Sequence, residues 1–98
     1  DINTENLGIV VNGIAYFKLR GNTQNLNLTI AAGDSRVEAQ ALVSQNVSIN
    51  HRGSNDILVN PQESISGVIR GYGDVISFNR PNNVDVSQIF NGRLVFRD

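Results

Sequence analysis

Three aspartates, Asp34, Asp56 and Asp74, follow one another along the chain at nearly regular steps, each close to a glycine. Carboxylate oxygens are ligands that Ca²⁺ prefers, so these side chains could hold calcium if successive turns stack into a column. The alternative interpretation is structural, because an aspartate in a turn accepts hydrogen bonds from its own backbone while glycine supplies the positive φ. We expect the structural role and therefore no cofactor, with calcium as the alternative.

The segment Arg70-Gly71-Tyr72-Gly73-Asp74 places an aromatic ring on a glycine-rich turn between two charged side chains. Such a ring combines a large apolar face with a polar hydroxyl, which suits contact with the face of a sugar. Tyr72, Asp74 and Arg70 are therefore the candidate ligand-binding residues, and plain packing or solvent exposure of Tyr72 is the alternative. The other aromatic residues are expected in the core, because they fall in apolar strand segments: Tyr16, Phe17, Phe78, Phe90 and Phe96.

Nucleophilic catalysis has no support in the sequence, and no catalytic residue is predicted. His51 is the only histidine, there is no cysteine, and no serine has the Gly-x-Ser-x-Gly context of a nucleophile elbow. Metal sites with two imidazoles or with thiolates are thereby excluded. We expect His51 to be an ordinary residue beside a turn and the protein not to be an enzyme.

The charge pattern argues against nucleic acid and membranes as partners. Eight basic and nine acidic side chains give a net charge of −1, and the arginines are scattered singly from Arg20 to Arg97. They form neither a basic stripe for a phosphate backbone nor a polybasic cluster for a membrane surface. No apolar run approaches the roughly 18 residues of a membrane-spanning segment. The polar N-terminus fits a secreted protein whose signal peptide has been removed, and equally a cytosolic fragment.

The composition predicts strands and turns. Val, Ile and Leu dominate the apolar residues and suit a pleated sheet, while the abundant Asn and Gly suit sharp turns. Asn is also expected in ladders of stacked side-chain amides. Residues 36–44 have a helical alternative, but there too we expect a strand. Ten strands are predicted from short apolar segments: Ile9–Val11, Ile14–Leu19, Leu26–Ile30, Val37–Leu42, Val47–Asn50, Ile57–Asn60, Ile65–Arg70, Val75–Phe78, Val84–Ile89 and Leu94–Phe96.

A polar turn containing Gly, Asn or Asp returns at near-regular intervals, which indicates an internal repeat. Each repeat has two short strands and two turns, too little to bury an apolar face alone, so neighbouring repeats must stack. Residues 1–98 are therefore expected to form a single all-β domain, a repeat-built β-solenoid with about 20 residues per coil. An antiparallel β-sandwich is the alternative. The turns are Asn12-Gly13, Gly33-Asp34, Gly53–Asp56, Gly71–Asp74 and Asn91–Arg93.

These turns, each followed by a strand, resemble the bacterial putative auto-transporter adhesin, head GIN domain family. The resemblance runs from Asn12 to Phe96 and is closest from Gly53 onward, where Gly71-Tyr72-Gly73-Asp74 keeps the full Gly-x-Gly-Asp form. Gly33-Asp34 and Gly53-Ser54-Asn55-Asp56 are degenerate forms of this turn, and Asn91-Gly92-Arg93 lacks the acid. The resemblance implies a β-helix-like scaffold in the cell envelope or secreted, as a short family member or part of a longer protein.

The expected function is a non-catalytic, extracytoplasmic binding or adhesion-type domain of the bacterial cell envelope, with a glycan or a protein surface as partner. One alternative is a carbohydrate-active β-helix similar in shape to pectate lyases, using the aspartates and Arg70; another is a purely structural envelope module. The apolar segment Leu94–Phe96 has little after it to cap a stack. We therefore also expect self-association through this end or a neighbouring domain.

Overall fold

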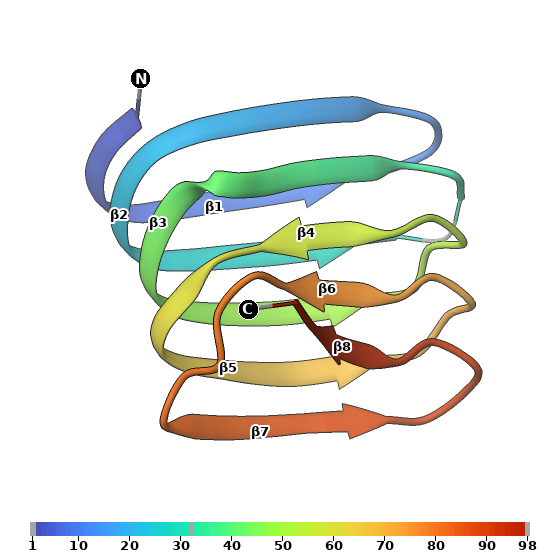
Figure 1. Cartoon of the computed structure of the whole chain (residues 1–98). Coiled ribbons are helices and arrows are strands. Elements are labelled where there is room, and N and C mark those ends of the chain that lie inside the picture. Colours follow the sequence, from blue (N-terminus) through green and yellow to red (C-terminus); the bar gives the residue numbers. More distant parts are fainter. Residues whose placement is uncertain (1, 32, 98) are drawn as a thin grey trace.

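Eight strands make up most of the part of the chain that the structure describes, and every pairing between them is parallel. The structure, a computed structural model, describes residues 2–31 and 33–97. These residues wind into a β-solenoid, which confirms the predicted fold and excludes the antiparallel sandwich (Figure 1). They contain no helix of the length and apolarity needed to cross a membrane. The strands are β1 (Ile2–Val11), β2 (Tyr16–Ile30), β3 (Arg36–His51), β4 (Ile57–Val59), β5 (Pro61–Ile69), β6 (Val75–Ser77), β7 (Asn83–Gln88) and β8 (Leu94–Phe96).

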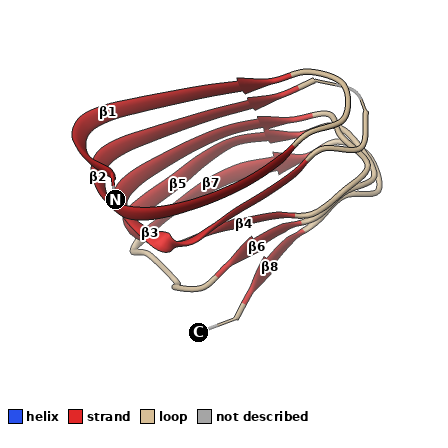
Figure 2. Cartoon of the chain, turned by 90° about the horizontal axis from the view of Figure 1, so that it is seen from above, coloured by secondary structure: helices blue, strands red, loops and turns tan. Residues whose placement is uncertain are grey.

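The first three strands are long because they bend around a corner of the solenoid instead of stopping there (Figure 2). The second polar turn expected in the repeats of β2 and β3 is therefore a bend within one strand. At this corner the buried Thr23 hydroxyl donates to the Asn25 carbonyl at 3.2 Å, and the buried Ser44 hydroxyl donates to the Leu42 carbonyl at 3.2 Å. Short side chains that bond to nearby backbone let the chain turn without leaving buried polar groups unpaired.

One inward-facing column shows how the coils stack. Leu7, Leu26, Val47, Ile65 and Val84 are register partners in successive strands, so the coils have similar but unequal lengths, and the one from Leu26 to Val47 is the longest. The three middle residues are fully buried because a coil covers them on each side. The eight strands form one sheet that bends at the corner, and the core lies between its two faces. One face contains β5, β7 and the C-terminal parts of β1, β2 and β3; the other contains β4, β6, β8 and the N-terminal parts of β2 and β3.

The predicted amide ladder is present and runs along the solenoid axis. Asn25 Nδ2 donates to Asn6 Oδ1 at 2.9 Å, and Asn46 Nδ2 donates to Asn25 Oδ1 at 3.2 Å. The ladder continues through the Ser64 hydroxyl, which donates to Asn46 Oδ1 at 2.8 Å. Each central amide both donates and accepts, so the ladder favours one register between neighbouring coils.

Gly67 is a position where coil stacking leaves no room for a side chain. It lies within β5 with φ of 128°, and a Cβ there would overlap the Ile49 backbone carbonyl of the preceding coil. We predict that Gly67→Ala lowers the free energy of unfolding by about 3 kcal/mol or more, through both the clash and the positive φ. The matched control is Gly8→Ala, because a Cβ at Gly8 meets no atom within 4 Å. Denaturant unfolding of both variants tests this, and equal stabilities would contradict the close packing at Gly67.

Candidate functional site

The candidate residues from the sequence lie on one side of the solenoid, where the turns stack on one another (Figure 1). Successive turns are joined by backbone hydrogen bonds. Ser54 N–H donates to the Gly33 carbonyl at 2.9 Å, Gly73 N–H to the Gly53 carbonyl at 3.1 Å, and Gly92 N–H to the Gly71 carbonyl at 2.9 Å. We call this surface the turn edge. Its described residues are 12–15, 31, 33–35, 52–56, 70–74 and 89–93.

Two of the three aspartates stand in one column of the turn edge. Asp74 N–H donates to Asp56 Oδ1 at 3.2 Å, and Arg93 N–H donates to Asp74 Oδ1 at 2.9 Å. Each carboxylate therefore bonds to the backbone of the next turn rather than to its own turn. Asp34 does not share this column, because Val37, Ile57 and Val75 are register partners and the residue preceding Val37 is Arg36.

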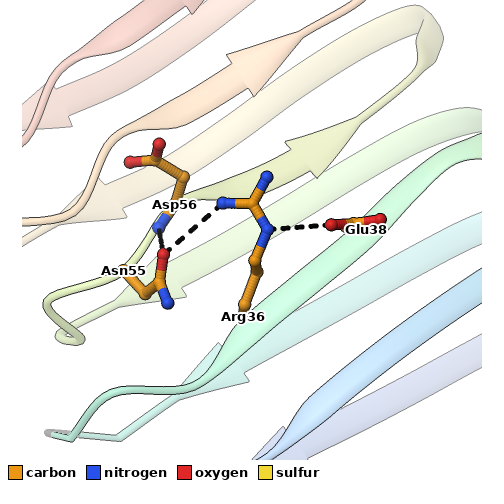
Figure 3. Close-up of polar contacts among 4 residues, drawn as sticks. All are labelled: Arg36, Glu38, Asn55 and Asp56. Carbon is orange, nitrogen blue, oxygen red and sulfur yellow. Dashed lines mark hydrogen bonds and ion pairs between the residues drawn. The ribbon is translucent and has the colours of Figure 1, made fainter.

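Arg36 thus places a positive charge at the position where a third carboxylate would complete a calcium column. Figure 3 shows its contacts: Nε donates to Glu38 Oε2 at 2.8 Å, and a terminal nitrogen donates to Asn55 Oδ1 at 3.5 Å. Asn55 Oδ1 also accepts from Asp56 N–H at 2.8 Å. The hydrogen bond from Arg36, followed by one from Tyr16, holds the pKa of the Glu38 carboxyl below its usual value. Within residues 2–31 and 33–97 no group of three or more His, Asp or Glu side chains is placed to share a metal ion.

Tyr72 and Phe90 form an exposed aromatic pair on the turn edge. Their ring centroids are 4.9 Å apart and their planes meet at 76°, an edge-to-face contact. Tyr72 is 64% exposed and Phe90 is 48% exposed. The Arg93 guanidinium donates to the Phe90 carbonyl at 3.2 Å and so joins the pair to the stacked turn. Of the candidate ligand residues, Tyr72 is thus brought against a second aromatic ring, Asp74 is bonded to backbone, and Arg70 is exposed.

The core prediction for Phe90 is wrong, because β7 ends at Gln88 and Phe90 belongs to the following turn. The core prediction for Tyr16 is wrong as well: this residue is 62% exposed, since its side chain lies on the outer face of β2. A signal for the aromatic pair is present in the sequence. Phe90 follows Tyr72 at the spacing of one coil, the same spacing that separates the register partners Val47 and Ile65.

Comparison with known proteins accords with this architecture. Residues 1–81 match the family described as "putative auto-transporter adhesin, head GIN domain". The chain belongs to the head GIN domain family. Among solved structures it is similar to a putative adhesin from Bacteroides fragilis, with 27% sequence identity and a TM-score of 0.87 over 94% of this chain. The head GIN domain chain spans 42% of the length of that protein. A search of curated proteins finds no match.

His51 of this head GIN domain lies beside a turn, as expected, but inside the core. It is fully buried at the end of β3. Its Nε2 is 2.9 Å from the Asn55 carbonyl oxygen, and its Nδ1 accepts from Gly53 N–H at 3.3 Å, an arrangement that assigns a neutral ring with the proton on Nε2. Burial lowers the pKa of His51 and outweighs the opposing effects of the Asn55 carbonyl, Asp56 and Asp74.

We predict that this neutral histidine makes the domain less stable in acid. The unfolded chain protonates His51 below its ordinary pKa of 6.5, whereas the folded chain protonates it only at lower pH. The stabilising contribution of the neutral His51 ring to the free energy of unfolding is therefore fully present above pH 6.5. It is lost as the pH falls, by at most about 1.4 kcal/mol per pH unit. Thermal melts between about pH 7.5 and 5 should show a falling Tm for the wild type and a flatter profile for His51→Gln. The same slope in both proteins would contradict the assignment.

We further predict that millimolar Ca²⁺ leaves the Tm unchanged, because a ligand bound to the folded state would raise it. Asp74→Ala should destabilise the domain by about 1 kcal/mol, equally with and without Ca²⁺, through loss of the hydrogen bond from Arg93 N–H. A rise in Tm with Ca²⁺ that Asp74→Ala abolishes would instead establish calcium binding at the aspartates.

Proposed function

We propose that this head GIN domain is a non-catalytic, extracytoplasmic binding domain of adhesion type, and that the Tyr72–Phe90 aromatic pair contacts its ligand. Membership of a family named for auto-transporter adhesins supports the adhesion role and the location outside the cytoplasm. The structural similarity to a putative adhesin points the same way. The observation that carries the choice of site is the exposure of two aromatic rings in direct contact.

Exposed aromatic rings favour a ligand with an apolar face. Burying such surface yields roughly 25 cal/mol per Å², and edge-to-face packing holds the two rings in a defined relative orientation. The C–H face of a sugar ring fits this surface. Polar groups at its rim, including Arg70 and the hydroxyl of Tyr72, can bond to the sugar hydroxyls. We therefore favour a glycan as the ligand class, with protein surfaces as the alternative partner.

A binding role also agrees with the way the aspartates are used. In a carbohydrate-active enzyme a catalytic carboxylate must reach the substrate. Here one oxygen of Asp56 and one of Asp74 each accept a backbone N–H from the next turn, and Arg36 stands beside Asp56. These contacts favour a scaffolding role for both residues over acid–base chemistry.

The test is a screen of the purified domain against a broad glycan panel, monitored for both binding and breakdown. For a glycan that binds, we predict that Tyr72→Ala and Phe90→Ala each weaken affinity at least about tenfold, the usual effect of truncating a central aromatic contact. Tyr16→Ala is the matched control, because Tyr16 is equally exposed but lies outside the aromatic pair. It should retain wild-type affinity.

Equal losses in all three variants would count against the aromatic pair as the site. Breakdown of an acidic polysaccharide that stops in the Asp74→Asn variant would replace the binding function with an enzymatic one. Binding in the wild type without breakdown is the expected result.

A further inference from the structure

A pocket of about 590 Å³ lies where β2 and β3 approach the corner of the solenoid, apart from the aromatic pair. Its size falls in the range of small-molecule sites. Its wall combines charged and polar side chains with the apolar surfaces of Leu19, Ala41 and Val43. The polar groups are Lys18, Arg20, Asn22, Glu38 and Gln40.

An irregularity in the stacking accompanies this pocket. Lys18 is the register partner of Glu38, but Arg20 is the partner of Ala41, so β3 has one more residue than β2 over this interval. Such bulges redirect side chains and recur next to functional sites. The extra residue falls in the longest coil, the one that ends at Val47.

The pocket offers a positive charge to a ligand. Glu38 is already engaged, since Arg36 Nε bonds to its carboxylate at 2.8 Å. Lys18 makes no hydrogen bond or ion pair with any residue of 2–31 and 33–97, and its charge acts on the neighbouring Glu38 carboxylate without direct contact. An anionic group of the ligand therefore has a cation to meet, and the Asn22 amide lies on the same wall.

The pocket wall also contains a buried acceptor without a donor. Gln40 Oε1 is enclosed and has no hydrogen-bond partner in the described part of the chain. The Gln40 backbone carbonyl, by comparison, accepts from Asn60 Nδ2 at 3.2 Å. A buried amide oxygen normally has a hydrogen-bond partner, so Gln40 Oε1 gains one if a ligand supplies a donor. A ligand hydroxyl is such a donor once the Gln40 amide turns toward the pocket.

We propose that this corner pocket binds a small ligand that carries both a carboxylate and hydroxyl groups, the chemistry of an acidic sugar. Lys18 faces the carboxylate, Gln40 accepts from a hydroxyl, and Leu19 and Val43 contact the apolar face of the ring. The site is separate from the Tyr72–Phe90 pair and does not depend on the function proposed for it.

The test compares three probes by isothermal titration calorimetry: galacturonic acid, galactose and acetate. Galacturonic acid should bind at least about tenfold more tightly than galactose, which lacks the carboxylate, or acetate, which lacks the hydroxyls. A titration with trigalacturonate shows whether the pocket also accepts an acidic sugar at the end of a polymer. Binding of either trigalacturonate or free galacturonic acid supports the site.

Lys18→Gln and Gln40→Leu should each weaken binding of galacturonic acid at least about tenfold. Gln40→Leu should melt at or above the wild-type temperature, because it removes an unpartnered buried oxygen, so a loss of binding cannot be ascribed to unfolding. The matched control is Arg52→Gln, which removes an exposed charge on the turn edge. This control and Tyr72→Ala should both bind like the wild type. Equal affinity for galactose and galacturonic acid, unchanged affinity in Lys18→Gln, or no binding of any probe would overturn the proposal.

Discussion

The parallel backbone hydrogen bonds that stack each coil on the next are the interaction on which the rest of the structure depends. They place every strand residue about 4.8 Å from its counterpart in the next coil, so side chains stand in columns. Neighbours in one column must therefore be compatible in size, polarity and charge. Val, Ile and Leu fill the inward columns, and the side-chain amides of Asn6, Asn25 and Asn46 are joined by hydrogen bonds near the corner. Unlike charges attract at this spacing, and Lys18 stands opposite Glu38 as its register partner.

Stacking also decides which residues of the turn edge remain for a ligand. Gly73 passes so close to the Asn55 carbonyl and the His51 ring that a side chain would not fit. The carboxylates of Asp56 and Asp74 accept backbone N–H groups from the following turns. Most of the recurring turn pattern thus serves the scaffold. Tyr72 and Phe90 project outward, and their exposure is a cost that a bound partner would relieve.

The longest coil departs from the regular stack, and a pocket lies on the solenoid wall beside this departure. Where all coils have equal length the strands form a smooth sheet, whereas the longest coil inserts one residue beside Lys18 and Arg20. Among the described residues, the resulting pocket has on its wall a lysine without a hydrogen bond and an amide oxygen without a donor. A repeat fold gains distinct sites in this way, because each departure from the repeat occurs at one place along the axis.

The sequence by itself determined the all-β class, the stacked repeat, the amide ladder and the position of Tyr72 on a glycine turn, because alternating apolar residues and Gly or Asn turns are local signals. Only the tertiary structure decided that Arg36 rather than Asp34 stands beside Asp56, that Phe90 joins Tyr72, and that His51 is buried in the core. These features depend on which residues of different coils meet. The coils are unequal in length, so shifting one strand by a single residue would change which side chains are neighbours in the adjacent coils. Packing and hydrogen bonds between coils set this register, and the local sequence pattern does not.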